Sequence, residues 1–487
     1  MHMNSDPRRR WYRPGPSRSR GFVKLMLARS AGIHVASSLL LASLALSLAP
    51  SPAGADPRRL ADSTWTDSWK LPNGLRVVTR DIRGATGVAM TVAYGFGSDQ
   101  DPTSREGWAS LLAYVDFLSA AGEYPERTLD ELASSRPLGW RIEVGPRYTR
   151  LTEVAKTEQL PGVLHQMALR LRQAAPSAKV LAAARKAVQA ELAQNYRDNL
   201  ANALHYGVPS VATADSGAAL RYAGGKGVDG AALPDVQAAI RTWYVPAKAV
   251  LSLAGNLSGS GIDVRRVIAN EFGSIPAGSP AAFPPAAPMH PAVRIVDRAE
   301  LARPAGVVAI LAPALSDTAH PSFFLHALLA GSSVTRRWGR TEWIPSPFQY
   351  SLLDEPELVR FYPPVTPSDV DSSRIREEYR EGLLALSQST ISFEEYRDLL
   401  DSVRWLLGGP LNANLRRRSR ADSGVLAAIS TTSAMRALWG SDEFWSSYLA
   451  RFSAIDHPAF ARWISYFFDP ERQVQLIFVP PFLHKKG

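Results

Sequence analysis

Short runs of apolar and β-branched residues recur along the chain, and most are bounded by glycine, asparagine or proline. Runs of four to eight such residues between turn-forming residues are typical of buried β-strands. The pattern predicts strands in both halves of the chain, at Leu75–Thr79, Val88–Tyr94, Val250–Leu253, Val307–Leu311 and Val474–Val479.

Other stretches place apolar residues three and four positions apart, which is the spacing of one face of an α-helix. The longest is Ala178–Leu204, which contains neither proline nor glycine, and Ser177 just before it is a suitable N-cap residue. In the second half the same spacing predicts helices at Phe323–Ala330 and Phe393–Leu407. Because each half runs from strands through helices to a final strand, the order predicts two α+β units.

The two units are separated by a proline-rich stretch. Residues 276–291 hold six prolines, so they cannot form a helix or a central strand. We therefore assign residues 56–272 to an N-terminal domain, 273–292 to a linker and 293–487 to a C-terminal domain. The predicted fold class is α+β, with two tandem domains of similar topology, each an antiparallel-rich sheet with helices, facing each other across a cleft.

The first 55 residues differ from the rest in charge and composition. They hold eight Lys/Arg and one acid, followed by the apolar run Ala31–Pro50 and the small residues Ala53-Gly54-Ala55. Such a sequence is typical of a secretory signal peptide, so we predict a mature chain that begins near Asp56 and lies in the periplasm. An uncleaved membrane anchor is the alternative, because the apolar run approaches the length of a membrane-spanning helix.

Composition narrows the possible functions. Of the 487 residues, 46% are hydrophobic and 21% are charged, as in ordinary globular proteins. The absence of cysteine excludes disulfides, cysteine-ligated zinc, iron–sulfur clusters and thiol catalysis. The formal net charge of +10 falls to +3 beyond residue 55, so the charge gives little support to nucleic-acid binding.

Several short segments resemble those of one known family in their order and spacing. They are Leu71–Val78 (LPNGLRVV), Tyr94–Asp99 (YGFGSD), Glu106–Ala109 (EGWA), Trp243–Leu251 (WYVPAKAVL), Ala254–Asn256 (AGN) and Ile391–Glu395 (ISFEE). Together they are similar to the pitrilysin/insulinase zinc peptidases, which include mitochondrial processing peptidase and the core subunits of the cytochrome bc1 complex. The resemblance covers essentially the whole chain after residue 56.

The resemblance implies a position for the family's metal site, an H-x-x-E-H motif with a second glutamate on a distant helix. The matching window is Ser110–Tyr114, in which Ser110, Ala113 and Tyr114 replace the first histidine, the general base and the second histidine. Glu191 keeps the family's spacing and matches the distant ligand. One carboxylate does not hold zinc, so we expect no catalytic residues, no bound metal and no cofactor.

Other residues offer no substitute site. His165 lies in an apolar helix-like run, and His205 follows Glu191 by 14 residues, too far along a helix to share its face at a metal. We interpret both histidines as structural. Ser110 lies within a predicted helix and lacks the Gly-x-Ser-x-Gly turn of a serine hydrolase, so we do not expect it to act as a nucleophile.

The family's peptidases also use an arginine and a tyrosine, seven residues apart, to bind substrate in the second domain. The resemblance matches the tyrosine to Tyr350, but seven residues earlier this chain has Trp343. Arg340 is the nearest arginine, and Pro345 and Pro347 indicate a rebuilt loop between them. Tyr350 and Arg340 are therefore weak candidates for substrate binding.

Three functions remain open. The first is a non-catalytic subunit of the cell envelope that binds an active zinc-peptidase paralogue. The second is an envelope peptide-binding or assembly protein without a peptidase partner, which holds extended chains by strand addition. The third is a zinc metalloendopeptidase with an unorthodox site, the one case in which zinc would be a cofactor. A membrane partner is expected only if the N-terminal segment stays uncleaved.

Overall fold

The computed structural model describes most of the chain between residues 64 and 480. The described ranges are 64–101, 105–136, 138–193, 200–213, 226–279, 288–298, 301, 304–339, 346–364, 372–387, 392–407, 418, 422–455 and 463–480. The predicted signal segment and residues 280–287 of the predicted linker lie outside them. Within these ranges no helix is long and apolar enough to cross a membrane.

The first half of the chain forms a six-stranded mixed sheet, here called sheet 1. Its strand order is β1-β2-β6-β3-β5-β4, and all neighbours are antiparallel except β2 and β6. Three of the strands correspond to predicted ones, since β2, β3 and β6 cover the runs at residues 75–79, 88–94 and 250–253. The strands are β1 (Thr64–Lys70), β2 (Arg76–Ile82), β3 (Gly87–Tyr94), β4 (Trp140–Val144), β5 (Thr149–Lys156) and β6 (Ala249–Gly255).

The second half forms a five-stranded mixed sheet, here called sheet 2, in the order β7-β11-β8-β10-β9. Only β7 and β11 pair in parallel. Strands β8 and β11 confirm the two strands predicted in this half. The strands are β7 (Ala292–Asp297), β8 (Ala305–Leu311), β9 (Phe348–Ser351), β10 (Glu355–Phe361) and β11 (Gln473–Val479).

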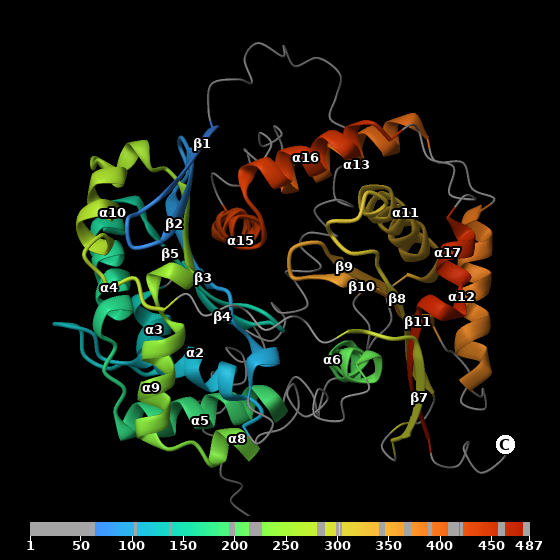
Figure 1. Ribbon diagram of the computed structural model, residues 1–487, viewed down its shortest axis with the longest axis horizontal. Helices are drawn as coiled ribbons and strands as arrows, with labels where there is room; N and C mark the ends of the chain where they lie inside the picture. The colour runs from blue at the N-terminus through green and yellow to red at the C-terminus, as the bar shows by residue number, and fades with distance from the viewer. Residues whose placement is uncertain are drawn as a thin grey trace, which may run out of the picture.

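Helices surround both sheets (Figure 1). The helix predicted over 178–204 is present as two helices, α5 and α6, with residues 194–199 between them outside the described ranges. The Ser177 hydroxyl accepts a hydrogen bond from Val180 N, which confirms the predicted N-cap. The helices of the first half are α2 (Trp108–Leu118), α3 (Leu129–Ser135), α4 (Leu160–Gln173), α5 (Ala178–Leu192), α6 (Leu200–Ala212), α8 (Lys226–Asp229), α9 (Leu233–Trp243) and α10 (Val264–Phe272).

The second half has its own set of helices, including the two predicted there. Helix α11 extends the predicted run 323–330 in both directions, and α13 matches the run 393–407 closely. The helices are α11 (His320–Trp338), α12 (Ser372–Ser387), α13 (Phe393–Leu406), α15 (Ser423–Trp439), α16 (Asp442–Ser453) and α17 (Ile464–Phe468).

Each sheet is covered on one face by a helix from the other half of the chain. Helix α15 packs on strands β2, β3, β5 and β6 of sheet 1, and α6 packs on β7, β8 and β11 of sheet 2. Figure 1 shows both helices between the two sheets. The outer face of sheet 1 is covered by first-half helices, which share one apolar core with it. The halves are therefore interlocked where these helices cross, in contrast to the predicted arrangement of two domains facing each other across a cleft.

Buried charges also connect the halves at the end of α15. Arg150 of β5 is 2% exposed and donates to both carboxylate oxygens of Glu143, at 2.7 and 2.9 Å. Its third nitrogen donates to Asp354 Oδ1 at 2.5 Å, in the turn between β9 and β10. These two carboxylates raise the pKa of Arg150, against the effect of burial. The network fixes the β4–β5 hairpin against the second half.

Candidate functional site

Helix α2 carries the window that resembles the family's metal motif, and an aspartate fixes its start. Gly107 precedes the helix with φ of 83°, a left-handed conformation that glycine adopts at little cost. Glycine has no capping side chain, and Asp101 supplies one instead. Its carboxylate accepts hydrogen bonds from the backbone N–H groups of Gly107, Trp108 and Ala109, at 2.8, 3.1 and 2.7 Å. A buried carboxylate at this end is also favoured by the helix dipole.

The structure brings Tyr114 of α2 and Glu191 of α5 together. The Tyr114 hydroxyl donates a hydrogen bond to Glu191 Oε2 at 3.0 Å. Burial and the neighbouring Glu191 carboxylate raise the pKa of Tyr114 well above its ordinary value. The phenol therefore stays protonated and acts as a donor to the carboxylate that matches the family's distant ligand.

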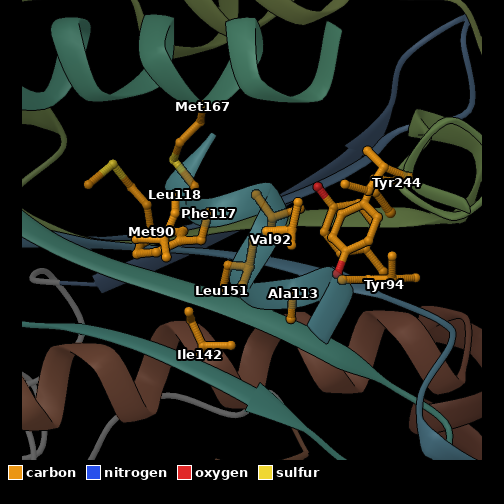
Figure 2. Packing of buried hydrophobic residues seen from close by; sticks show 14 of the residues in the cluster. Met90, Val92, Tyr94, Ala113, Phe117, Leu118, Ile142, Leu151, Met167 and Tyr244 are labelled. Carbon is orange, nitrogen blue, oxygen red and sulfur yellow. The ribbon is translucent and has the colours of Figure 1, made fainter. Parts of the chain in front are cut away.

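Ala113 and Ser110 lie on the same helix with different surroundings. Ala113 is 0% exposed and belongs to the apolar core between α2 and sheet 1. Figure 2 shows it among side chains of this core that include Tyr94, Val92 and Leu151. Ser110 is partly exposed. The position that matches the family's general base is thus a methyl group inside packed apolar side chains, with no group that could take a proton from water.

The residues at these positions do not fit a zinc ion. Zinc sites in peptidases use three protein ligands, usually with imidazole among them. Here the set is one carboxylate, one serine hydroxyl and one protonated phenol, and the phenol already donates to the carboxylate. Across the part of the chain that the structure describes, no group of three or more His, Asp or Glu residues is arranged to hold a metal ion. No catalytic step through zinc is derived for this chain.

The two histidines of the first half lie away from this site. His165 of α4 bonds Glu271 through Nδ1 at 2.8 Å and Glu123 through Nε2 at 3.0 Å, and these bonds raise its pKa. His205 of α6 donates from Nδ1 to Gln349 Oε1, 2.6 Å away, beneath sheet 2. Burial and nearby Arg360 lower the pKa of His205 well below its ordinary value. Both contacts are structural links between elements.

The structure describes one of the two candidate substrate-binding residues. Tyr350 is 4% exposed, and its hydroxyl donates to the Pro356 carbonyl oxygen at 3.1 Å, inside the aromatic core of the second half. His320 Nε2 lies 3.3 Å from the same hydroxyl. The Tyr350 hydroxyl is thus buried, with hydrogen-bonding partners inside the core. Arg340 lies outside the described residues.

Asp116 is a buried acid near the site that the sequence analysis did not single out. Its side chain is 1% exposed, and within the described ranges Oδ2 has no hydrogen-bond partner. Burial raises the pKa of Asp116 to about 7, while Arg170 acts in the opposite direction. In the sequence, a single aspartate in an apolar helical run looks like a residue on the exposed polar face of the helix. The sequence pattern therefore could not identify Asp116 as a buried acid.

Comparison with known proteins identifies the fold of this chain. No family model matches the sequence, and no curated protein matches it. Among solved structures, a protease from Helicobacter pylori matches with a TM-score of 0.66 at 13% identity, over 86% of this chain and 100% of that one. An inactive peptidase M16 domain from Pseudomonas fluorescens matches with a TM-score of 0.60 at 16% identity, over 85% and 98%. The chain has the fold of the M16 peptidases.

This M16 fold, that of the pitrilysin and insulinase family, also occurs in chains about twice as long. The periplasmic protease PqqL from Escherichia coli matches with a TM-score of 0.60 at 15% identity, over 89% of this chain but 49% of PqqL. The chain therefore spans about half the length of that M16 protein. At these sequence identities, structural similarity shows the fold alone. Whether the chain has peptidase activity depends on the residues at the site.

Proposed function

We propose that this M16-fold protein is a non-catalytic subunit that pairs with an active zinc-peptidase paralogue. The Tyr114–Glu191 hydrogen bond carries the proposal, because it engages the single carboxylate that matches a family ligand. Buried Ala113 adds to it, since no general base stands at that position. A protein that keeps the peptidase fold but lacks the metal ligands can act as a subunit that binds a catalytic partner without taking part in the reaction.

Length supports the pairing. The chain covers 100% of the Helicobacter pylori protease chain but only 49% of PqqL. A chain of this size therefore matches one of two successive parts of a longer M16 protein. In the proposal the missing part is a second chain that holds intact zinc ligands, and both chains are exported to the periplasm.

The pairing is tested by purifying the full chain under native conditions from cells that make it at natural levels. We expect a stoichiometric second protein with an H-x-x-E-H motif, and chelator-sensitive peptidase activity in the complex only. Isolation as a single chain without a peptidase would contradict the proposal. Chelator-sensitive activity of the single chain, freed of contaminating peptidases, would favour the third function.

The alignment of the site is tested separately by rebuilding the ligands. We expect S110H/Y114H to bind zinc, because two imidazoles four residues apart would join Glu191. Metal analysis after dialysis measures this, with S110H/Y114H/E191A as the matched control that loses it. Adding Ala113→Glu should destabilise the chain, since it places a carboxylate in a packed apolar core. Failure of S110H/Y114H to bind zinc would show that the residues are wrongly aligned.

Peptide binding by strand addition stays a second candidate because of one observation. Strand β7 is an edge of sheet 2, and its Val293 and Ile295 are 56% and 40% exposed. An apolar edge strand can pair with an extended chain. Replacing Val293 with lysine should abolish capture of peptides if this is the function, and leave the paired complex intact if it is not.

A further inference from the structure

Three arginines lie together where the end of α15 meets strand β2 of sheet 1. Arg76 and Arg80 belong to β2, and Arg436 belongs to α15, which packs beside that strand (Figure 1). Residues two positions apart in a strand share a face, so Arg76 and Arg80 both lie on the face that α15 covers. The hydrogen bond from Arg76 Nη1 to the carbonyl oxygen of Ala437 agrees with this placement. The opposite face of β2 packs in the core with α2, so the arginines are separate from the candidate site on that helix.

Arg80 is a buried cation that no carboxylate of the described residues pairs with. It is 5% exposed, and within the described ranges its Nε atom has no hydrogen-bond partner. Burial and the neighbouring Arg436 guanidinium both lower the pKa of Arg80, to about 10. Guanidinium groups stay charged at neutral pH, and a buried charge costs much free energy unless it is paired. An unsatisfied buried group of this kind is explained by an ion that binds beside it.

The acid that Arg436 contacts is already engaged. One carboxylate oxygen of Asp442, at the start of α16, accepts from Arg436 Nη2 at 2.6 Å, and the other accepts from Ser68 Oγ at 2.8 Å. Arg436 Nε is itself buried and has no partner among the described residues. Three guanidinium groups against one carboxylate leave two positive charges in excess at this end of α15.

A purely structural role accounts for one of the three arginines but not for Arg80. Basic side chains near the end of a helix often bond its last carbonyl groups and interact favourably with its dipole. Arg76 does this through the carbonyl oxygen of Ala437. Within the described residues, Arg80 has no such bond to a carbonyl oxygen. Its charge therefore has no structural partner in this part of the molecule.

We propose that Arg80 and Arg436 bind a small oxyanion of the phosphate class between β2 and α15. A dianion balances the two excess charges, and its oxygens suit the forked donors of two guanidinium groups. Because Arg80 is 5% exposed, only a small ion can reach it. Strand β1 offers the approach, since Lys70 lies opposite Arg76 in the antiparallel register and is exposed on the same face. A bound ion would join α15 of the second half to β2 of the first.

The experiment is calorimetric titration of the full chain at pH 8 with inorganic phosphate, sulfate and acetate, with chloride keeping the ionic strength constant. We expect one saturable site for phosphate and sulfate, and at least tenfold weaker binding of acetate, which carries a single charge. Arg80→Met should weaken phosphate binding at least tenfold. Arg83→Met removes the same charge from a side chain that is 65% exposed and should leave the affinity unchanged.

Thermal melting supplies a readout that a structural arginine would not give. Without phosphate, Arg80→Met should melt no lower than the natural chain, because it removes an unpaired buried charge. Phosphate should raise the melting temperature of the natural chain, since a ligand that binds only the folded state stabilises it, and should not raise that of Arg80→Met. Arg80→Gln takes the place of Arg80→Met if circular dichroism shows that the latter does not fold.

Several outcomes would overturn the proposal. They are no saturable binding of phosphate or sulfate to the natural chain, unchanged phosphate binding in the folded Arg80 variant, or a lower melting temperature of that variant without phosphate. Equal affinities for acetate and sulfate would refute the dianion. Glycerol 3-phosphate should bind at least tenfold more weakly than phosphate, and binding as tight would refute the assignment to a small free ion.

Discussion

The two helices that cross between the halves hold their sheets by different means. Helix α15 places Ser430 against sheet 1, where its hydroxyl lies 3.0 Å from both the Ser252 carbonyl oxygen and Thr91 Oγ1. Helix α6 instead packs Leu204 and Val208 into an apolar cluster with strands of sheet 2. Both surfaces are buried. The α15 surface is bonded through hydroxyl groups and the Arg150 charges, whereas the α6 surface is mainly hydrocarbon, with a polar contact from His205 to Gln349.

This comparison distinguishes the contacts that fix the position of a helix on its sheet from the contacts that stabilise the fold. Hydrogen bonds between buried hydroxyls add modestly to stability but demand one register, because a shifted helix would leave them unpaired. Apolar burial contributes more and tolerates small shifts. The buried Arg150–Asp354 pair also lies at the α15 crossing, and its geometry depends on how the halves are placed. We therefore expect the α15 crossing to be the rigid one.

The largest effect is expected at the buried charges of the α15 crossing. Arg150→Met removes the central cation of a buried network and leaves two carboxylates, Glu143 and Asp354, with only Arg141 to balance them, which should cost about 4 kcal/mol. Urea denaturation measures it. Arg147→Met is the matched control, because the Arg147–Glu357 pair is partly exposed and should cost less than about 1 kcal/mol. Equal losses would mean that burial of Arg150 is unimportant.

At the α6 crossing the largest effect should come from lost apolar volume. Leu204 is 0% exposed, and Leu204→Ala should cost about 3 kcal/mol through lost burial and the cavity left behind. The control is Leu384→Ala on α12, where the side chain is 42% exposed. If the two variants unfold at the same urea concentration, α6 is not anchored as the structure indicates.

Acid should loosen the α6 crossing before the α15 crossing. The folded-state pKa of His205 lies well below its value of about 6.5 in the unfolded chain, so the unfolded state takes up a proton first as pH falls below that value. Stability should drop by at most about 1 kcal/mol between pH 6.5 and 5.5. Hydrogen exchange at the two pH values should show faster opening of α6 than of α15.

Variants of two histidines give opposite signs for this acid effect. His205→Gln should reduce the loss of stability in acid. His165 has a raised pKa, so its contribution is complete below pH 6.5 and is lost as pH rises through its folded-state value. His165→Gln should therefore lower stability more at pH 5.5 than at pH 8. The same pH slope in both variants would refute the assignment.

The smallest effect is expected for the hydroxyl that positions α15. Ser430→Ala should cost about 1 kcal/mol, because Thr91 keeps its bond to Thr152. Ser446→Ala on the exposed side of α16 should be neutral. Urea denaturation measures the loss. No loss of stability would mean that apolar contacts alone position α15.

The sequence predicted many helices and strands correctly, but it did not predict which sheet each helix packs on. Runs such as 88–94 and 474–479 became inner strands because they are mostly apolar and β-branched, and the spacing of Tyr114 and Glu191 placed both at one site. The pattern at 178–204 indicated helix but could not show that α6 would leave its own half. Periodicity shows that a face will be buried and carries no information on which sheet will bury it.

Tyr350 illustrates a second limit. Its match to a family position came from neighbouring residues, and sequence alone could not show that Pro356 and His320 would enclose its hydroxyl. A cavity of about 320 Å³ between β5 and α15 escaped prediction for a similar reason. Alanines at 427 and 428 are ordinary helix residues, and only the placement of α15 on β5 turns them into a wall.

The exchange of α6 and α15 has a consequence during synthesis on the ribosome. The last strand of sheet 1 ends at Gly255, and the helix that covers its inner face begins only at Ser423. At roughly 5–20 residues per second, the ribosome needs on the order of ten to thirty seconds to make the intervening chain. During that time the inner face of sheet 1 stays uncovered. We expect a nascent chain of this kind to bind a holding chaperone until α15 has emerged.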